Sequence, residues 1–126
     1  MPWQRMAPHT RTLRQQPTVA IGSGGAIYLN AFAMTNYFKG VQVVALLYDP
    51  AAHRLGIQAV ARNETKVFRL NFSNKTASTG VISARSVVKH LGLKYDKATL
   101  VFDGKWDQKT RILEVDLQKY EEKPRG

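Results

Sequence analysis

The sequence predicts a mainly β fold with short helices, an α+β domain made of two copies of one structural unit. Two similar stretches, GAIYLNAFAMTNYFKGVQVVALLYD and GVISARSVVKHLGLKYDKATLVFDG, begin at Gly25 and Gly80. Each contains, in the same order, a short apolar segment, a segment with apolar residues at helical spacing, and a segment with alternating apolar residues that ends in a polar turn. The length of 126 residues allows one domain with tails, and 44% hydrophobic residues are typical of a globular protein.

Residues 1–17 are predicted to be a flexible basic tail. They contain three prolines and few apolar residues, and their cations are Arg5, Arg11 and Arg14. The prolines prevent a long helix or a packed strand. We expect either an arm that lies along phosphate groups through these arginines or a frayed terminus. The domain itself is expected over 18–118, followed by a C-terminal tail over 119–126.

The first unit is expected over residues 18–62. The segment TVAI at Thr18 is short and apolar, as a strand would be, and the polar loop GSG separates it from a second strand. Asn30 is a good N-cap, so a helix is expected from there to about Lys39-Gly40, where glycine favours helix termination. The segments VQVVALLYD and RLGIQAV, joined by the turn DPAAH, then predict a hairpin.

The second unit is expected over residues 66–117, with the same order of elements. The strand KVFRLNF, the loop SNKTAST and the strand GVISA precede a helix that Ser83 is expected to cap. This helix is expected to end at Leu91-Gly92. A hairpin with the turn DGKWDQKT follows, and RILEVDL forms its second strand.

The ungapped match also predicts which residues of the two hairpins are equivalent and share one strand face. It pairs alternating residues of the first hairpin with alternating residues of the second: Val43, Ala45 and Leu47 with Ala98, Leu100 and Phe102. Alternate residues of a strand share one face. The turn after Phe102 is expected to be longer than the turn after Tyr48, so a shift of register is expected there.

Charge is the strongest compositional feature of the chain. The formal net charge is +10, and residues 1–48 contain no Asp or Glu. Up to Lys94, twelve basic residues are opposed only by Asp49 and Glu64, whereas from Tyr95 onward seven basic residues balance seven acidic ones. A concentrated positive field attracts polyanions. The imbalance therefore predicts a nucleic acid or an acidic protein as partner, and the alternative is a solvated basic surface with no partner.

The stretches GAIYLN, VQVVALLYDPAAHRLGIQAV and GVISARSVVKHLGLKYDKATLVFD resemble the repeating unit of the SpoVT/AbrB superfamily, which includes MazE-type antitoxins. Units of that family run from a strand through a loop into G-x-I-x-[IL]-P, then a short helix ending in L-G, then an apolar hairpin. The resemblance covers about residues 18–117. Asn30 and Arg85 stand where the family has a proline, and GSGGAIYLN lacks the arginine of the family pattern.

The resemblance implies a swapped-hairpin barrel, in which two units interleave their hairpins to close one sheet. Family members usually use two chains for this purpose, whereas two tandem units could close the barrel within one chain. Closure removes the unpaired strand edges that a lone unit would leave. We therefore expect a monomer with pseudo-dimer symmetry, or otherwise a homodimer of such chains.

The resemblance also implies DNA binding through the loop and strand before each helix. Together with nearby cations, the pattern gives these candidate nucleic-acid-binding residues: Arg14, Ser23, Gly24, Lys75, Thr76, Ser78, Arg85 and Lys89. Arg85 is expected to contact a base, because a guanidinium can bind guanine in a bidentate manner. Its alternative role is that of a solvated residue at a helix start. Lys75 is expected to contact a phosphate.

These features together predict a DNA-binding protein, a transcription regulator or an antitoxin-like protein, that acts on double-stranded DNA by electrostatic and groove contacts. The alternatives are a basic adaptor subunit of a nucleoprotein or protein complex, and a binder of single-stranded nucleic acid. No apolar run approaches the length of a membrane span, and the first residues lack the apolar core of a secretory signal. A cytoplasmic, nucleoid-associated protein is expected.

Enzymatic and metal chemistry are not expected from this sequence. There is no cysteine, and the three histidines lack metal-ligand spacing. The GSGG segment is not followed by G-K-[ST], as a nucleotide-binding loop requires. Asp103 and Asp107 flank a turn around Trp106, which is expected to be exposed, and they are typical of turn chemistry. No catalytic residue, cofactor or metal is therefore assigned.

Overall fold

The computed structural model describes residues 16–72, 78–93, 95 and 98–124. The elements in these ranges are β1 (Thr18–Ile21), the 3-10 helix η1 (Ser23–Gly25), β2 (Ala26–Leu29), α1 (Ala31–Asn36), β3 (Val43–Asp49), β4 (Arg54–Ala59), β5 (Phe68–Phe72), β6 (Gly80–Ser83), α2 (Arg85–His90), β7 (Ala98–Asp107), β8 (Ile112–Asp116) and β9 (Glu121–Pro124). No helix in these ranges is long and apolar enough to span a membrane. The candidate site residues Arg14, Lys75 and Thr76 lie outside the described residues.

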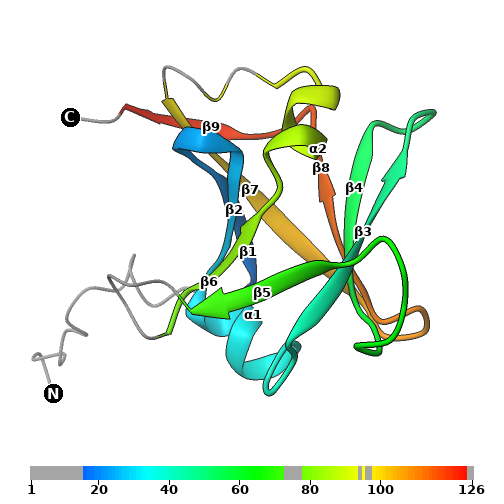
Figure 1. Ribbon diagram of the computed structural model, residues 1–126. Helices are drawn as coiled ribbons and strands as arrows, with labels where there is room; N and C mark the ends of the chain where they lie inside the picture. Colours follow the sequence, from blue (N-terminus) through cyan, green and yellow to red (C-terminus); the bar gives the residue numbers. More distant parts are fainter. Residues whose placement is uncertain (1–15, 73–77, 94, 96–97, 125–126) are drawn as a thin grey trace, which may run out of the picture.

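Eight strands close into an antiparallel barrel, so the prediction of a mainly β fold with short helices is confirmed (Figure 1). Hydrogen-bonded neighbours follow the order β1-β2-β6-β5-β3-β4-β8-β7, and a further pairing between β1 and β7 closes the circle. Closure gives each of these strands a partner on both sides. The strand β9 pairs with the first part of β7, within the segment expected to be a C-terminal tail. In Figure 1, β5 crosses the front of the barrel and α2 lies above β5.

The pairings of the barrel repeat when the first unit, β1 to β4 with α1, is exchanged for the second unit, β5 to β8 with α2. The pair β1–β2 corresponds to β5–β6, the pair β3–β4 to β7–β8, and the pair β1–β7 to β5–β3. The pairs β2–β6 and β4–β8 join equivalent strands. Ile27 lies opposite Ile82, its own match in the sequence, and Gly56 lies opposite Glu114. A pseudo-two-fold axis therefore passes through these two residue pairs.

The two hairpin turns are equivalent residue by residue. Asp49 Oδ1 accepts hydrogen bonds from the backbone N–H groups two and three residues later, at 3.1 and 3.3 Å. Asp107 Oδ1 accepts the matching bonds at 2.9 and 3.3 Å. His53 and Arg111 then both have positive φ, 53° and 58°. Each turn has the same number of residues between its strands, so the prediction of a longer second turn is wrong.

The extra residues of the second unit lie instead between α2 and β7. Equivalent residues are 55 positions apart in β2 and β6 but 58 positions apart in the hairpins, as the strand registers require. The fully buried Val44 therefore matches the fully buried Phe102, and Leu47 is 41% exposed. The predicted match of Val43, Ala45 and Leu47 with Ala98, Leu100 and Phe102 is therefore wrong, because it uses an offset of 55 positions.

The core lies inside the barrel, and both units contribute to it in the same way. Ile27 and Ile82 are fully buried beside the pseudo-two-fold axis. Ala33 on α1 and Val88 on α2, which also match in the sequence, are fully buried as well. Burial of aliphatic side chains is the dominant favourable term in folding, so the repeated positions are those that stabilise the barrel.

The two helices begin differently. Asn30 caps α1 as expected, and its Oδ1 accepts a hydrogen bond from the N–H of Ala33 at 3.1 Å. The residue before α2 is Ala84, which has no side-chain cap, so the expectation that Ser83 caps this helix is wrong. Ser83 still belongs to β6, and the buried Ala84 completes the inward face of that segment. The helix α1 also ends earlier than expected, at Asn36.

Trp106 is partly buried, so the expectation that it is exposed is wrong. Its ring stacks on the ring of Tyr37, with centroids 4.3 Å apart and an angle of 12° between the planes. Its ring also lies 6.2 Å from that of Phe38 in an edge-to-face arrangement. Aromatic pairs in these geometries stabilise beyond the area they bury. The cluster attaches the end of α1, in the first unit, to β7 of the second.

Candidate nucleic-acid interface

Within the described strands and helices, acidic residues occur on one side of the barrel only. The strands β1, β2, β6 and β5 are neighbours in the sheet, and with α1 and α2 they contain no Asp or Glu; these elements are termed the acid-free wall. The acid-bearing wall consists of β3, β4, β8, β7 and β9. Its carboxylates are those of Asp49, Asp103, Asp107, Glu114, Asp116, Glu121 and Glu122. Glu64 lies in the linker between β4 and β5.

The acid-free wall has exposed cations that no carboxylate neutralises. Arg69 lies on β5, and Arg85 and Lys89 lie about one turn apart on α2. None of the three forms an ion pair with another described residue. On the acid-bearing wall, by contrast, Arg54 forms ion pairs with two carboxylates at 3.1 and 3.6 Å. The charge imbalance of the sequence is thus expressed as a difference between the two walls of the barrel.

The loop of the first unit and the helix of the second meet at one end of the acid-free wall. Because β2 and β6 are antiparallel, with Ala26 opposite Ser83, the loop before β2 lies beside the start of α2. Gly25 has a φ of 75°, and a Cβ there would lie 2.8 Å from the Cα of Arg85. Only glycine allows this conformation and this close approach. Four exposed candidate residues gather here, namely Ser23, Gly24, Arg85 and Lys89.

Ser78 does not belong to this group. It precedes β6, and Gly80 at the start of β6 lies opposite Leu29 at the end of β2. Ser78 therefore lies at the other end of these strands from Arg85. The antiparallel pairing of β2 with β6 thus separates Ser78 from Ser23 and Gly24, although all three precede equivalent strands.

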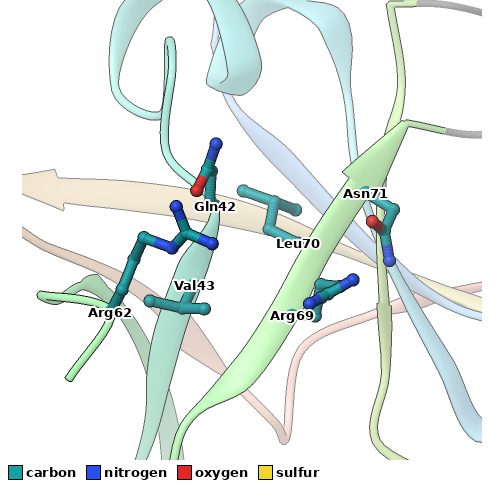
Figure 2. Close-up of a pocket in the computed structure, with 6 residues that line it drawn as sticks. All are labelled: Gln42, Val43, Arg62, Arg69, Leu70 and Asn71. Atoms are coloured by element: carbon teal, nitrogen blue, oxygen red, sulfur yellow. The ribbon is translucent and has the colours of Figure 1, made fainter. Parts of the chain in front are cut away.

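A pocket that the sequence analysis did not identify lies where β3, β5 and the linker after β4 meet (Figure 2). Its volume is about 230 Å³, and it is lined by Gln42, Val43, Arg62, Arg69, Leu70 and Asn71. Val43 lies opposite Arg69 in the β3–β5 pair. The N–H of Val60 donates to the carbonyl of Val43 at 3.4 Å, which holds the start of the linker against β3.

The side chains of the pocket are two guanidinium groups, two amides and two aliphatic groups. Figure 2 shows Arg62 entering from the linker beside Gln42, while Arg69 and Asn71 extend from β5. In KVFRLNF the alternation of apolar residues already indicates that Arg69 and Asn71 face outward. No sequence signal could place Arg62 beside them, because the course of the linker depends on how β3 and β5 pair.

The described residues contain no metal-binding cluster, and the carboxylates of the two hairpin turns do not resemble a general acid. No group of three or more His, Cys, Asp and Glu residues among them could hold a metal ion. Hydrogen bonds from the N–H groups of Thr110 and Lys109 lower the pKa of Asp107, and the hydrogen bond with Arg54 is the main cause of the lowered pKa of Asp49. A general acid needs a raised pKa, so these two carboxylates are better suited to stabilising turns.

Comparison with known proteins adds no assignment to this chain. No protein-family model, curated protein sequence or solved structure matches it.

Proposed function

We propose that this protein binds nucleic acid, and duplex DNA in particular, on its acid-free wall, and that it is not an enzyme. The observation that supports this proposal is the segregation of charge. Arg69, Arg85 and Lys89 are exposed on a wall where the described residues include no carboxylate. Duplex DNA carries one negative charge per roughly 1.7 Å of its axis, so such a surface binds it with release of counterions.

The positions of the side chains suggest a role for each. Arg85 and Lys89 are spaced to lie on the same face of α2, so both would contact the same duplex. Arg85 would contact a base in a groove, while Lys89 and the more distant Arg69 would contact phosphates. Beside the start of α2, Ser23 has a small side chain and Gly24 has none, so the DNA backbone could approach the chain closely there.

More specifically, we propose that the barrel is a swapped-hairpin barrel of the SpoVT/AbrB type and that one chain forms it. In support, β3 of the first hairpin pairs with β5 of the second unit, and β7 of the second hairpin pairs with β1 of the first. Each unit thus completes its sheet with a strand of the other, as two chains would in a dimer. The corresponding cellular role would be a transcription regulator or an antitoxin-like protein, with a cytoplasmic, nucleoid-associated location.

Phe72 favours a second candidate function, the binding of single-stranded DNA or RNA. It is 61% exposed at the end of β5, next to Asn71. An exposed aromatic ring near cations is a stacking platform for unpaired bases. Tyr28, by contrast, is half-buried and lies over Gly22, where a Cβ would be 2.9 Å from the ring. Tyr28 is therefore less suited to stacking than Phe72.

Fluorescence anisotropy would distinguish these functions. One sequence would be offered as duplex DNA, as single-stranded DNA and as RNA, over a series of salt concentrations. With roughly 4–8 phosphate contacts, log K for the duplex should fall against log salt with a slope of about −4 to −7. A preference for single strands that Phe72→Ala removes would favour the second candidate. Affinities that do not depend on salt would contradict both and would favour the basic adaptor.

A further inference from the structure

We propose that the pocket between Arg62 and Arg69 binds one phosphate group. The inference rests on the proposed function in one respect, since the phosphate would belong to the nucleic acid on the acid-free wall, and the pocket lies where β5 of that wall meets β3. It would be either an internal phosphodiester or a terminal phosphomonoester. The pocket itself is defined without reference to nucleic acid, by two guanidinium groups, the amides of Gln42 and Asn71, and an aliphatic surface.

The donors of the pocket complement the oxygens of a phosphate. Arg69 comes from β5 and Arg62 from the linker after β4, so two separate segments each contribute one guanidinium group to the lining of the pocket. A guanidinium remains charged at every physiological pH and presents a planar fork of donors that suits phosphate oxygens. The side-chain amides of Gln42 and Asn71 supply further N–H donors for the remaining oxygens.

The size of the pocket suits a small group. Its volume of about 230 Å³ is below the roughly 300–1,000 Å³ of sites that hold drug-sized ligands or cofactors. It corresponds to several water molecules at about 30 Å³ each. A phosphate with its ester oxygens and the first carbon atoms matches this size better than a whole nucleotide does.

The positive charge of the pocket is not compensated by the described residues around it. Glu64 is in the same linker, but it forms no ion pair with Arg62 or Arg69. The pocket is also held by backbone hydrogen bonds, because the N–H of Leu70 donates to the carbonyl of Gln42 at 2.9 Å. The backbone from which Gln42 and the residues of β5 extend is therefore fixed, and an anion would not have to displace a described carboxylate from either guanidinium group.

The pseudo-two-fold axis supplies an internal control for this site. The strand registers equate Arg69, Asn71 and Gln42 with Ala20, Gly22 and Leu100. None of these three counterparts has a polar side chain. The equivalent position in the first unit therefore folds without residues that could bind an anion. On the other side of β7, β9 brings Glu122 opposite Leu100. The polar set is thus not required by the fold, and we expect one phosphate site per chain.

The test is an NMR titration of the isotope-labelled full chain with inorganic phosphate, against chloride at the same ionic strength. The side-chain amide signals of Gln42 and Asn71 should shift in a saturable manner. Arg62→Gln and Arg69→Gln should each weaken this binding by about tenfold or more, because each removes a charge-assisted pair of hydrogen bonds. Lys66→Gln removes the same charge from the same linker without lining the pocket, and should leave the binding unchanged.

A shift that is not saturable, or an equal loss in Lys66→Gln, would overturn the phosphate site. The NMR spectrum of each variant shows whether it is folded. If Arg69→Gln does not fold, Arg62→Gln still tests the site, because Arg62 lies in the linker and not in a strand. DNA binding without phosphate binding would leave the proposed function standing and overturn this inference, and phosphate binding without DNA binding would do the reverse.

Oligonucleotides with and without a 5′-phosphate identify the source: a preference for the phosphorylated end that Arg62→Gln removes indicates the terminal group, and equal affinity indicates an internal one.

Discussion

The first and second units form the same strand pairs, the same turns and the same buried positions, yet their outer faces differ. The second unit has Arg69 and Asn71 on β5, whereas the first unit has Ala20 on β1 and Gly22 just after it at the matching positions. Positions that agree in both units are those that the barrel needs to close. Positions that disagree are free of that requirement, so the difference between the units indicates where function lies.

Asn30 and Arg85 show the same contrast at the helix starts. The side chain of Asn30 accepts hydrogen bonds from the N–H groups of Thr18 and Ala33 and donates one to the carbonyl of Gln16, all at 3.1 Å. Arg85, its counterpart 55 positions later, is exposed and forms no such bond with another described residue. The first residue is a structural clamp between β1 and α1, and the second is available for a partner.

The largest effect is expected where the two units are most alike. Ile27→Ala and Ile82→Ala each remove a fully buried side chain at the pseudo-two-fold axis. Each should lower the free energy of unfolding by about 2–5 kcal/mol, and the two losses should be similar. Urea unfolding measures both. A loss below about 1 kcal/mol for only one of them would show that the two units do not share the core equally.

A smaller and unequal effect is expected at the helix starts. Asn30→Ala removes the cap of α1 and leaves the N–H of Thr18 without its acceptor, so it should cost about 1–2 kcal/mol in the free energy of unfolding. Arg85→Ala should change this free energy by less than about 0.5 kcal/mol. Thermal unfolding of the two variants tests the contrast. Equal costs would mean that Arg85 has a structural role.

The smallest expected effect is the pH dependence of stability that comes from the two hairpin turns, which are alike in both units. The pKa values of Asp49 and Asp107 are both lowered, by the hydrogen bond from Arg54 and by backbone N–H groups respectively. A lowered pKa in the folded state means that the ionised form stabilises it above the ordinary pKa of Asp. That contribution is lost as the pH falls through the folded-state values. NMR titration of the carboxyl carbons should show both below the ordinary value, and an ordinary pKa for either would contradict the equivalence of the turns.

Much of the barrel was predictable, because local signals agree with its tertiary structure. The matched glycines, the cap at Asn30 and the buried pair Ile27 and Ile82 follow from residue spacing. The face of β3 was not predictable from an ungapped match, because the extra residues lie before β7 and only the pairing reveals the offset of 58 positions. A shift by an odd number of residues reverses which side of a strand faces the core.

The candidate site was predictable only in part. Ser23, Gly24, Arg85 and Lys89 are brought together as the antiparallel pairing of β2 and β6 dictates. The same pairing separates Ser78 from them, which a linear comparison of the two units does not show. The grouping of Arg62 with Arg69 depends on the linker after β4, and neither spacing nor composition determines the course of such a segment.

The claim that duplex DNA binds on the acid-free wall is tested most directly by removing the same number of charges from each wall. Arg85→Ala/Lys89→Ala alters the acid-free wall, and Lys109→Ala/Lys119→Ala removes two exposed cations beside strands of the acid-bearing wall. The affinity for duplex DNA is measured over a series of salt concentrations by fluorescence anisotropy. The first pair should weaken binding by about ten- to a hundredfold and reduce the magnitude of the salt slope by about two, while the second should leave the slope nearly unchanged. Equal losses for both pairs would show that only the net charge matters and would contradict a DNA-binding wall.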